Sequence, residues 1–185
     1  MNNAIRHVVL FACIACCACG GQLYKVAVPP KLAPPFLASD ANGLNAAARA
    51  LTGDEALGQF DANLLLAGIV AVDVQLANRA QTPAQLAAFN WQLQDSANTQ
   101  FKLIPPKQAL RRVMRHYGNT LYLRAGYAET LANYETLALP LTVTLAAQQE
   151  LRGFLFFESK YEATGSTGLT LTGNLAGQPL RLKLN

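Results

Sequence analysis

Cysteine is confined to one end of this chain, and histidine is scarce. The 185 residues contain four cysteines, all within the first 19 positions, and two histidines, His7 and His116. A disulfide framework distributes its cysteines through a domain to close loops. A structural zinc site needs cysteine or histidine pairs on two separated segments. The sequence therefore predicts no disulfide, no metal site and no cofactor in the body of the chain.

Charge is also sparse. Charged residues make up 14% of the chain and the net charge is +4. Proteins that bind nucleic acid concentrate lysine and arginine in a dense stripe, whereas most basic residues here are scattered. We therefore expect no nucleic-acid partner. The hydrophobic fraction of 51% is typical of a globular domain and argues against disorder over most of the chain.

The motifs of the common hydrolases are missing. No serine stands in a G-x-S-x-G elbow, HExxH is absent, and no serine or carboxylate flanks His116. Glu158 and Glu162 are four residues apart, and Asp73 lies on the polar side of a predicted strand. Nothing around Glu158 and Glu162 indicates a desolvating pocket, so we expect both to be solvated at the surface, and Asp73 to be at the surface or paired. The sequence predicts a protein that is not an enzyme.

No apolar run is long enough to cross a bilayer. The run over 8–18 falls well short of the roughly 20 residues that a spanning helix needs. It follows a basic residue, Arg6, and ends in small residues. These features are typical of a secretory signal peptide rather than a transmembrane anchor. We expect residues 1–18 to be an export leader.

The end of this run resembles the lipobox of bacterial lipoproteins. Residues 14–21 read Ile-Ala-Cys-Cys-Ala-Cys-Gly-Gly, and in that family a cysteine after small residues is acylated. The resemblance implies that Cys19 carries the lipid, with Cys17 and Cys16 as alternative acceptors. It also implies stable attachment to a membrane, because several acyl chains hold a protein where one chain does not.

The residue after the acylated cysteine sorts these lipoproteins in cells that have two membranes. Aspartate there causes retention at the inner membrane, whereas Gly20 follows Cys19 in this chain. The resemblance therefore implies an outer-membrane protein that faces the periplasm or the cell surface. The expected partners are the membrane and a further protein of the envelope.

Residues 19–37 are predicted to be a proline-rich tether, and residues 38–185 to be the domain. The pairs Pro29-Pro30 and Pro34-Pro35 favour an extended chain of about 3 Å per residue. In the domain, apolar residues alternate with polar ones over 69–77, which predicts a strand. Further strands are expected over 89–94, 101–104, 141–145, 151–158, 169–171 and 180–184, whereas 43–51 fits either a strand or a helical turn.

Two helices are expected among these strands. Thr52 and Glu55 have the spacing of a capping box, which predicts a helix over 54–60. Pro106 favours a helix start and Gly118 a helix end, which predicts a second helix over 106–117. For residues 119–137 we expect a loop with one helical turn.

Short strands without βαβ alternation predict a mainly β fold, an antiparallel β-sandwich with helical insertions near 54–60 and 106–117. Residues 153–157 are apolar on both faces, which indicates a central strand. Segments 68–78 and 152–157 resemble paired strands in immunoglobulin-like modules of exported bacterial proteins. This resemblance implies an immunoglobulin-like sandwich and names no activity.

Cations recur along one side of the second predicted helix. Lys107, Arg111 and Arg115 are spaced four apart and Arg112 is adjacent. The ordinary interpretation is the solvated face of an amphipathic helix. The alternative is contact with anionic headgroups, lipopolysaccharide or an acidic partner.

The aromatic residue Trp91 raises a further question of binding. An exposed tryptophan offers a stacking platform for sugars, but its alternation with polar neighbours places Trp91 in the core. We therefore expect a non-enzymatic interaction or structural module of the cell envelope, held by lipid. The alternatives are a module that binds glycan or peptidoglycan, and a hydrolase that uses carboxylates.

Overall fold

The computed structural model describes residues 39–41, 43–118, 123–175 and 178–184. The predicted leader (1–18) and tether (19–37) lie outside the described residues, and so do all four cysteines. The lipidation site therefore stays a prediction.

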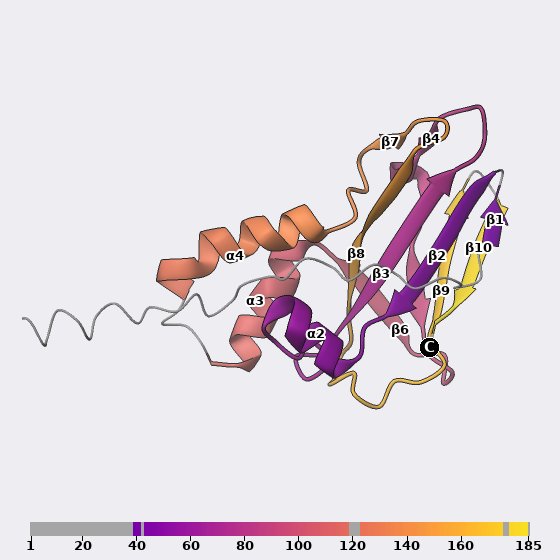
Figure 1. The fold of residues 1–185 in the computed structure, drawn as a ribbon. Helices are drawn as coiled ribbons and strands as arrows, with labels where there is room; N and C mark the ends of the chain where they lie inside the picture. The colour runs from indigo at the N-terminus through magenta and orange to yellow at the C-terminus, as the bar shows by residue number, and fades with distance from the viewer. Residues whose placement is uncertain (1–38, 42, 119–122, 176–177, 185) are drawn as a thin grey trace, which may run out of the picture.

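Eight strands form one antiparallel sheet in the order β1-β2-β3-β8-β6-β5-β9-β10. Their bounds are β1 Ser39–Ala41, β2 Leu44–Ala50, β3 Ile69–Asn78, β5 Gln92–Gln94, β6 Gln100–Ile104, β8 Glu150–Glu158, β9 Thr170–Leu175 and β10 Gln178–Lys183. The two edge strands, β1 and β10, also contact each other, so the sheet curls round on itself (Figure 1). Two short strands, β4 Ala84–Gln85 and β7 Thr144–Leu145, pair separately. The prediction of a mainly β, antiparallel domain is confirmed.

The pair of β3 and β8 forms the centre of the sheet. Their register runs from Ile69 opposite Glu158 to Ala77 opposite Glu150. Val70 and Phe157 belong to a core inside the curl, whereas Ala71 and Phe156 belong to a second core on the outer face. Strands covered on both faces are apolar at successive positions, which is why the sequence of residues 153–157 correctly predicted a central strand.

Three helices cover the outer face of this central pair: α2 Gly53–Phe60, α3 Pro106–His116 and α4 Leu123–Leu137 (Figure 1). The capping box of Thr52 and Glu55 opens α2 as predicted. Pro106 is the first residue of α3, and Gly118 follows its end with a φ of +65°, a left-handed conformation that glycine adopts without strain. Both predicted helices are confirmed.

Helix α4 shows that the prediction of a loop with one helical turn was wrong. Tyr127, Leu131 and Tyr134 are spaced four and three residues apart and all pack against the outer core. Tyr134 is fully buried, 5.0 Å from Phe60 between ring centroids. This apolar stripe was present in the sequence, but Gly126 and the polar residues between its members concealed it.

The strand predicted over 89–94 is shorter than expected. Only Gln92–Gln94 pairs as β5, and a short 3₁₀ turn, Leu86–Ala88, precedes it. Phe89 and Trp91 are nevertheless buried in the inner core, stacked with ring centroids 5.1 Å apart. The core placement of Trp91 is therefore confirmed. The ambiguous segment 43–51 is the strand β2, and the strand predicted over 141–145 is reduced to β7.

Candidate functional site

The predicted cationic stripe of α3 divides into two parts. Lys107, Arg111 and Arg115 are exposed, and none of them belongs to an ion pair between described residues. Arg112 instead turns toward the sheet, where its Nε donates to the Ala67 carbonyl at 2.7 Å and its Nη2 to the Ser159 carbonyl at 2.6 Å. The stripe that is available to a partner therefore consists of Lys107, Arg111 and Arg115, whereas Arg112 holds the helix against the sheet.

A groove of about 400 Å³ lies along this stripe, and we call it the cationic groove. Its lining consists of Pro105, Lys107, Gln108, Arg111, Arg112, Arg115 and Glu158. The Glu158 carboxylate accepts hydrogen bonds from Gln108 Nε2 at 3.1 Å and Arg112 Nη1 at 3.4 Å. Because Glu158 is already paired in this way, it leaves the charges of the exposed stripe available to an outside anion.

A second groove, of about 330 Å³, shares Arg112 and Arg115 with the cationic groove. Its lining consists of Leu66, Ala67, Gly68, Arg112, Arg115, His116, Lys160, Tyr161 and Glu162. The two grooves together bring five lysine and arginine side chains next to two carboxylates. His116 lies at the surface. No pattern in the sequence indicated Lys160 and Tyr161 here, because they follow the end of β8 and reach α3 only through the fold.

Gly68 explains how this region closes tightly. Its φ is +69°, and a β-carbon there would stand 2.5 Å from the Tyr161 carbonyl oxygen and 2.8 Å from Arg112 Nη2. Only glycine fits both that conformation and that space. The close approach brings Tyr161 and the end of β8 against the side chain that anchors α3.

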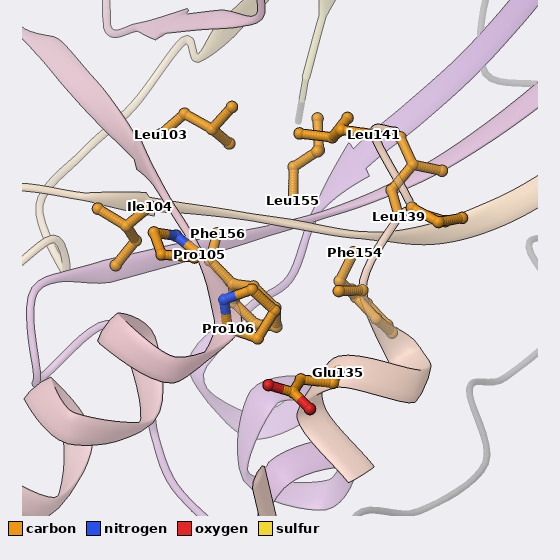
Figure 2. Close-up of a pocket in the computed structure, with 12 residues that line it drawn as sticks. Leu103, Ile104, Pro105, Pro106, Glu135, Leu139, Leu141, Phe154, Leu155 and Phe156 are labelled. Atoms are coloured by element: carbon orange, nitrogen blue, oxygen red, sulfur yellow. The ribbon is translucent and has the colours of Figure 1, made fainter. Parts of the chain in front are cut away.

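A third groove is apolar and measures about 440 Å³ (Figure 2). Its lining is Leu103, Ile104, Pro105, Pro106, Glu135, Ala138, Leu139, Pro140, Leu141, Phe154, Leu155 and Phe156. The end of β6, the start of α3, the end of α4 with the segment 138–141 after it, and the middle of β8 contribute most of these residues. Pro105, between β6 and α3, lines the cationic groove as well. Sequence reasoning missed this groove. The apolar run over 137–141 is the signal that could have indicated it.

Asp73 lies in a network of charged side chains. It is completely buried, and its carboxylate accepts hydrogen bonds from Arg152 Nε at 2.9 Å and Nη2 at 2.6 Å. The hydrogen bond to Asp73 raises the pKa of Arg152. Arg49 Nε lies 3.9 Å from the same carboxylate and its Nη1 pairs with Glu55. Of the two environments expected for Asp73, the structure gives the paired one.

The carboxylates considered for hydrolysis do not share a groove. Glu158 lines the cationic groove, Glu162 lines the second groove, and Asp73 lines none of the three grooves. Within the described ranges no three histidine, cysteine or acidic side chains gather in a way that could hold a metal ion. None of these three grooves is lined by two of the three carboxylates.

Exposed aromatic side chains are few in the described part of the chain. Among its large hydrophobic residues, Tyr117 is 37% exposed and Tyr161 is 71% exposed, whereas Trp91 is 4% exposed. They form no row on a sheet face of the kind that would favour sugar binding. Within the same ranges, no helix combines the length and the apolar character that a membrane crossing requires.

Comparison with known proteins gives only distant likenesses. No family model matches the chain, and no curated protein matches it. The solved yjhA protein of Bacillus subtilis is 10% identical over 80% of this chain and 96% of its own, with a TM-score of 0.42. An ApaG protein of Pseudomonas aeruginosa is 16% identical over 71% and 96%, with a TM-score of 0.34. The ycdA protein of Bacillus subtilis, a candidate lipoprotein, is 11% identical over 82% of this chain and 39% of its own, with a TM-score of 0.43. These values are too low to transfer residues or roles.

Proposed function

We propose that this chain is a lipid-anchored, non-enzymatic module of the cell envelope whose α3 stripe docks on an anionic membrane surface. In this proposal residues 1–18 direct export, and Cys19, or alternatively Cys17 or Cys16, carries the lipid. Residues 19–37 connect the anchor to the domain. The protein resides at the outer membrane where the cell has two membranes.

The unpaired state of the stripe is the observation that carries the docking role. Lys107, Arg111 and Arg115 are exposed and share no ion pair with a described residue, so their charge is available to an outside partner. Basic residues held near an anionic membrane surface contribute about 1 kcal/mol each. A lipid anchor keeps the domain near that surface, so even this modest attraction is sufficient to orient it.

We propose further that the curled sheet is an immunoglobulin-like sandwich. Its two halves are β1-β2-β3-β8 and β6-β5-β9-β10. Val72 of the first half and Leu93 and Leu171 of the second belong to one buried cluster, as expected where two sheet faces pack together. The three outer helices are then insertions into the sandwich, and α3 among them carries the cationic stripe.

Flotation with lipid vesicles tests the docking role. The full chain is prepared with all four cysteines replaced by serine, so that no acyl group can be attached. Two kinds of vesicle are compared, one of neutral lipid alone and one in which about a third of the lipid is anionic. Binding to each is measured at low and at high salt. Changing Arg111→Glu and Arg115→Glu should lower binding to the anionic vesicles about tenfold at low salt, because two attractive charges become repulsive.

The matched control is the pair Arg181→Glu and Lys183→Glu. Both residues are exposed on β10, so the net charge changes equally while α3 is untouched. Binding of the control should stay within about twofold to threefold of the parent, because distant charges are screened. Equal losses in both variants would reduce the effect to net charge and would refute docking through α3.

A further inference from the structure

We propose that the apolar groove binds the hydrocarbon chain of a single-chain anionic amphiphile whose charged head lies in the cationic groove. The inference deepens the proposed function and uses two residues of the same stripe, Lys107 and Arg111. It adds a ligand that is drawn out of solution or out of the membrane, whereas docking alone leaves lipids in place.

The size and lining of the apolar groove fit a hydrocarbon chain. Its volume of about 440 Å³ lies within the range of about 300–1,000 Å³ that is typical of small-ligand pockets, which are mostly apolar with a few polar groups. Eleven of its twelve lining residues are apolar, and Glu135 is the exception. Such a surface gains stability mainly when it covers another apolar group.

The charges around the groove select the sign of the head. Pro105 lines both grooves, so the apolar groove opens next to Lys107 and Arg111. Figure 2 shows Glu135 near Pro106, with Leu103 and Leu141 at the opposite end of the groove. A hydrocarbon chain that runs from the stripe toward Leu103 and Leu141 leads away from the Glu135 carboxylate, and its head lies next to two cations, Lys107 and Arg111. Charge complementarity therefore favours a phosphate or carboxylate head over a neutral one.

Calorimetric titration of the full chain with its four cysteines replaced by serine tests this site. The probe is dodecyl phosphate below its micellar concentration, compared with octyl phosphate, dodecyl maltoside and inorganic phosphate. Dodecyl phosphate should bind most tightly of the four. Each methylene removed from a buried part of the chain should weaken binding by up to about fourfold, and inorganic phosphate should bind weakest.

Variants separate the two parts of the site. Leu141→Trp fills the groove and should weaken binding of dodecyl phosphate at least about tenfold. Leu103→Trp should act in the same direction and replaces it if Leu141→Trp does not fold. Val143→Trp is the matched control, because Val143 lies in the same loop, is 39% exposed and does not line the groove. Lys107→Glu with Arg111→Glu should reduce the preference of dodecyl phosphate over dodecyl maltoside about fivefold or more.

Four results would overturn the proposal: no binding of dodecyl phosphate, equal affinity for the phosphate and the maltoside, independence from chain length, or an equal effect of Val143→Trp and Leu141→Trp. Loss of probe binding in the acylated chain purified from membranes would also overturn it, because the groove would then hold the chain's own acyl group.

Vesicle flotation distinguishes this failure from failure of the proposed function. If anionic vesicles bind through α3 but dodecyl phosphate does not bind, the ligand site is wrong and docking stands. If dodecyl phosphate binds in the groove but Arg111→Glu with Arg115→Glu leaves vesicle binding unchanged, docking is wrong and the ligand site stands.

Discussion

Gly153 of β8 lies directly against the backbone of Leu139. A β-carbon on Gly153 would stand 2.5 Å from the Leu139 nitrogen and 2.6 Å from its Cα. Leu139 N also donates to the Phe154 carbonyl at 2.9 Å. The absence of a side chain at Gly153 thus lets the segment after α4 cross β8 and form one wall of the apolar groove.

The first prediction concerns this contact. Gly153→Ala should destabilise the fold by about 2 kcal/mol or more, because backbone cannot move aside as a flexible side chain can. Gly165→Ala is the control, since nothing lies within 4 Å of a β-carbon built there. Urea unfolding followed by the fluorescence of the single tryptophan, Trp91, measures both. A change of less than about 0.5 kcal/mol in Gly153→Ala would refute the close approach.

The second prediction concerns the buried carboxylate. Asp73→Asn should destabilise the protein by about 3 kcal/mol, because it removes the buried negative charge that binds the guanidinium of Arg152. Arg79 and Glu150 form a comparison pair at 2.7 Å that is about half exposed. Glu150→Gln should cost less than about 1 kcal/mol. Similar losses in both variants would contradict the assigned difference in burial.

The third prediction separates two neighbouring arginines. Arg112→Gln should cost about 2 kcal/mol, because its guanidinium donates to Ala67 and Ser159 and pairs with Glu158. Arg111→Gln should change stability by less than about 0.5 kcal/mol, since surface positions are tolerant, yet it should weaken vesicle binding. Thermal unfolding measures the first effect and flotation the second. If Arg111→Gln cost more stability than Arg112→Gln, Arg111 rather than Arg112 would face the sheet, and this prediction would be refuted.

The fourth prediction concerns pH. Partial burial raises the pKa of Glu55, but the Thr52 N–H and Arg49 lower it more, so it lies below the ordinary value of 4.5. A carboxyl whose pKa is lower in the folded chain adds stability above about pH 4.5, and that stability is lost as the pH falls through the folded pKa. Glu55→Gln should therefore lower stability at pH 6 and narrow its difference from the parent toward pH 3. A constant difference across that range would contradict the assignment.

Much of the fold followed from local chemistry in the sequence. Thr52 with Glu55 and Pro106 with Gly118 mark helix ends through short-range hydrogen bonds and backbone preferences, so both helices were predictable. Residues 153–157 consist of one glycine and four large apolar residues. This pattern predicts a strand that is covered on both faces of its sheet. These signals lie within a few residues of the structure they determine.

The parts that escaped prediction depend on contacts between distant segments. The apolar groove exists because residue 139 crosses residue 153, and the apolar run over 137–141 marks a segment that packs without indicating which strand it crosses. Lys160 lines the second groove with Arg115 only because β8 ends beside α3. Arg112 is the same residue type as its neighbour Arg111, yet its guanidinium donates to the carbonyls of Ala67 and Ser159 instead of facing solvent.

A salt-wash fractionation of cells tests the central claim that lipid holds the chain while α3 docks it. The parent protein should stay with membranes at both low and high salt. The variant with Cys16, Cys17 and Cys19 changed to serine should stay at low salt and be released at high salt, because ionic contacts are screened whereas acyl chains are not. A variant that resists high salt as the parent does would contradict the account.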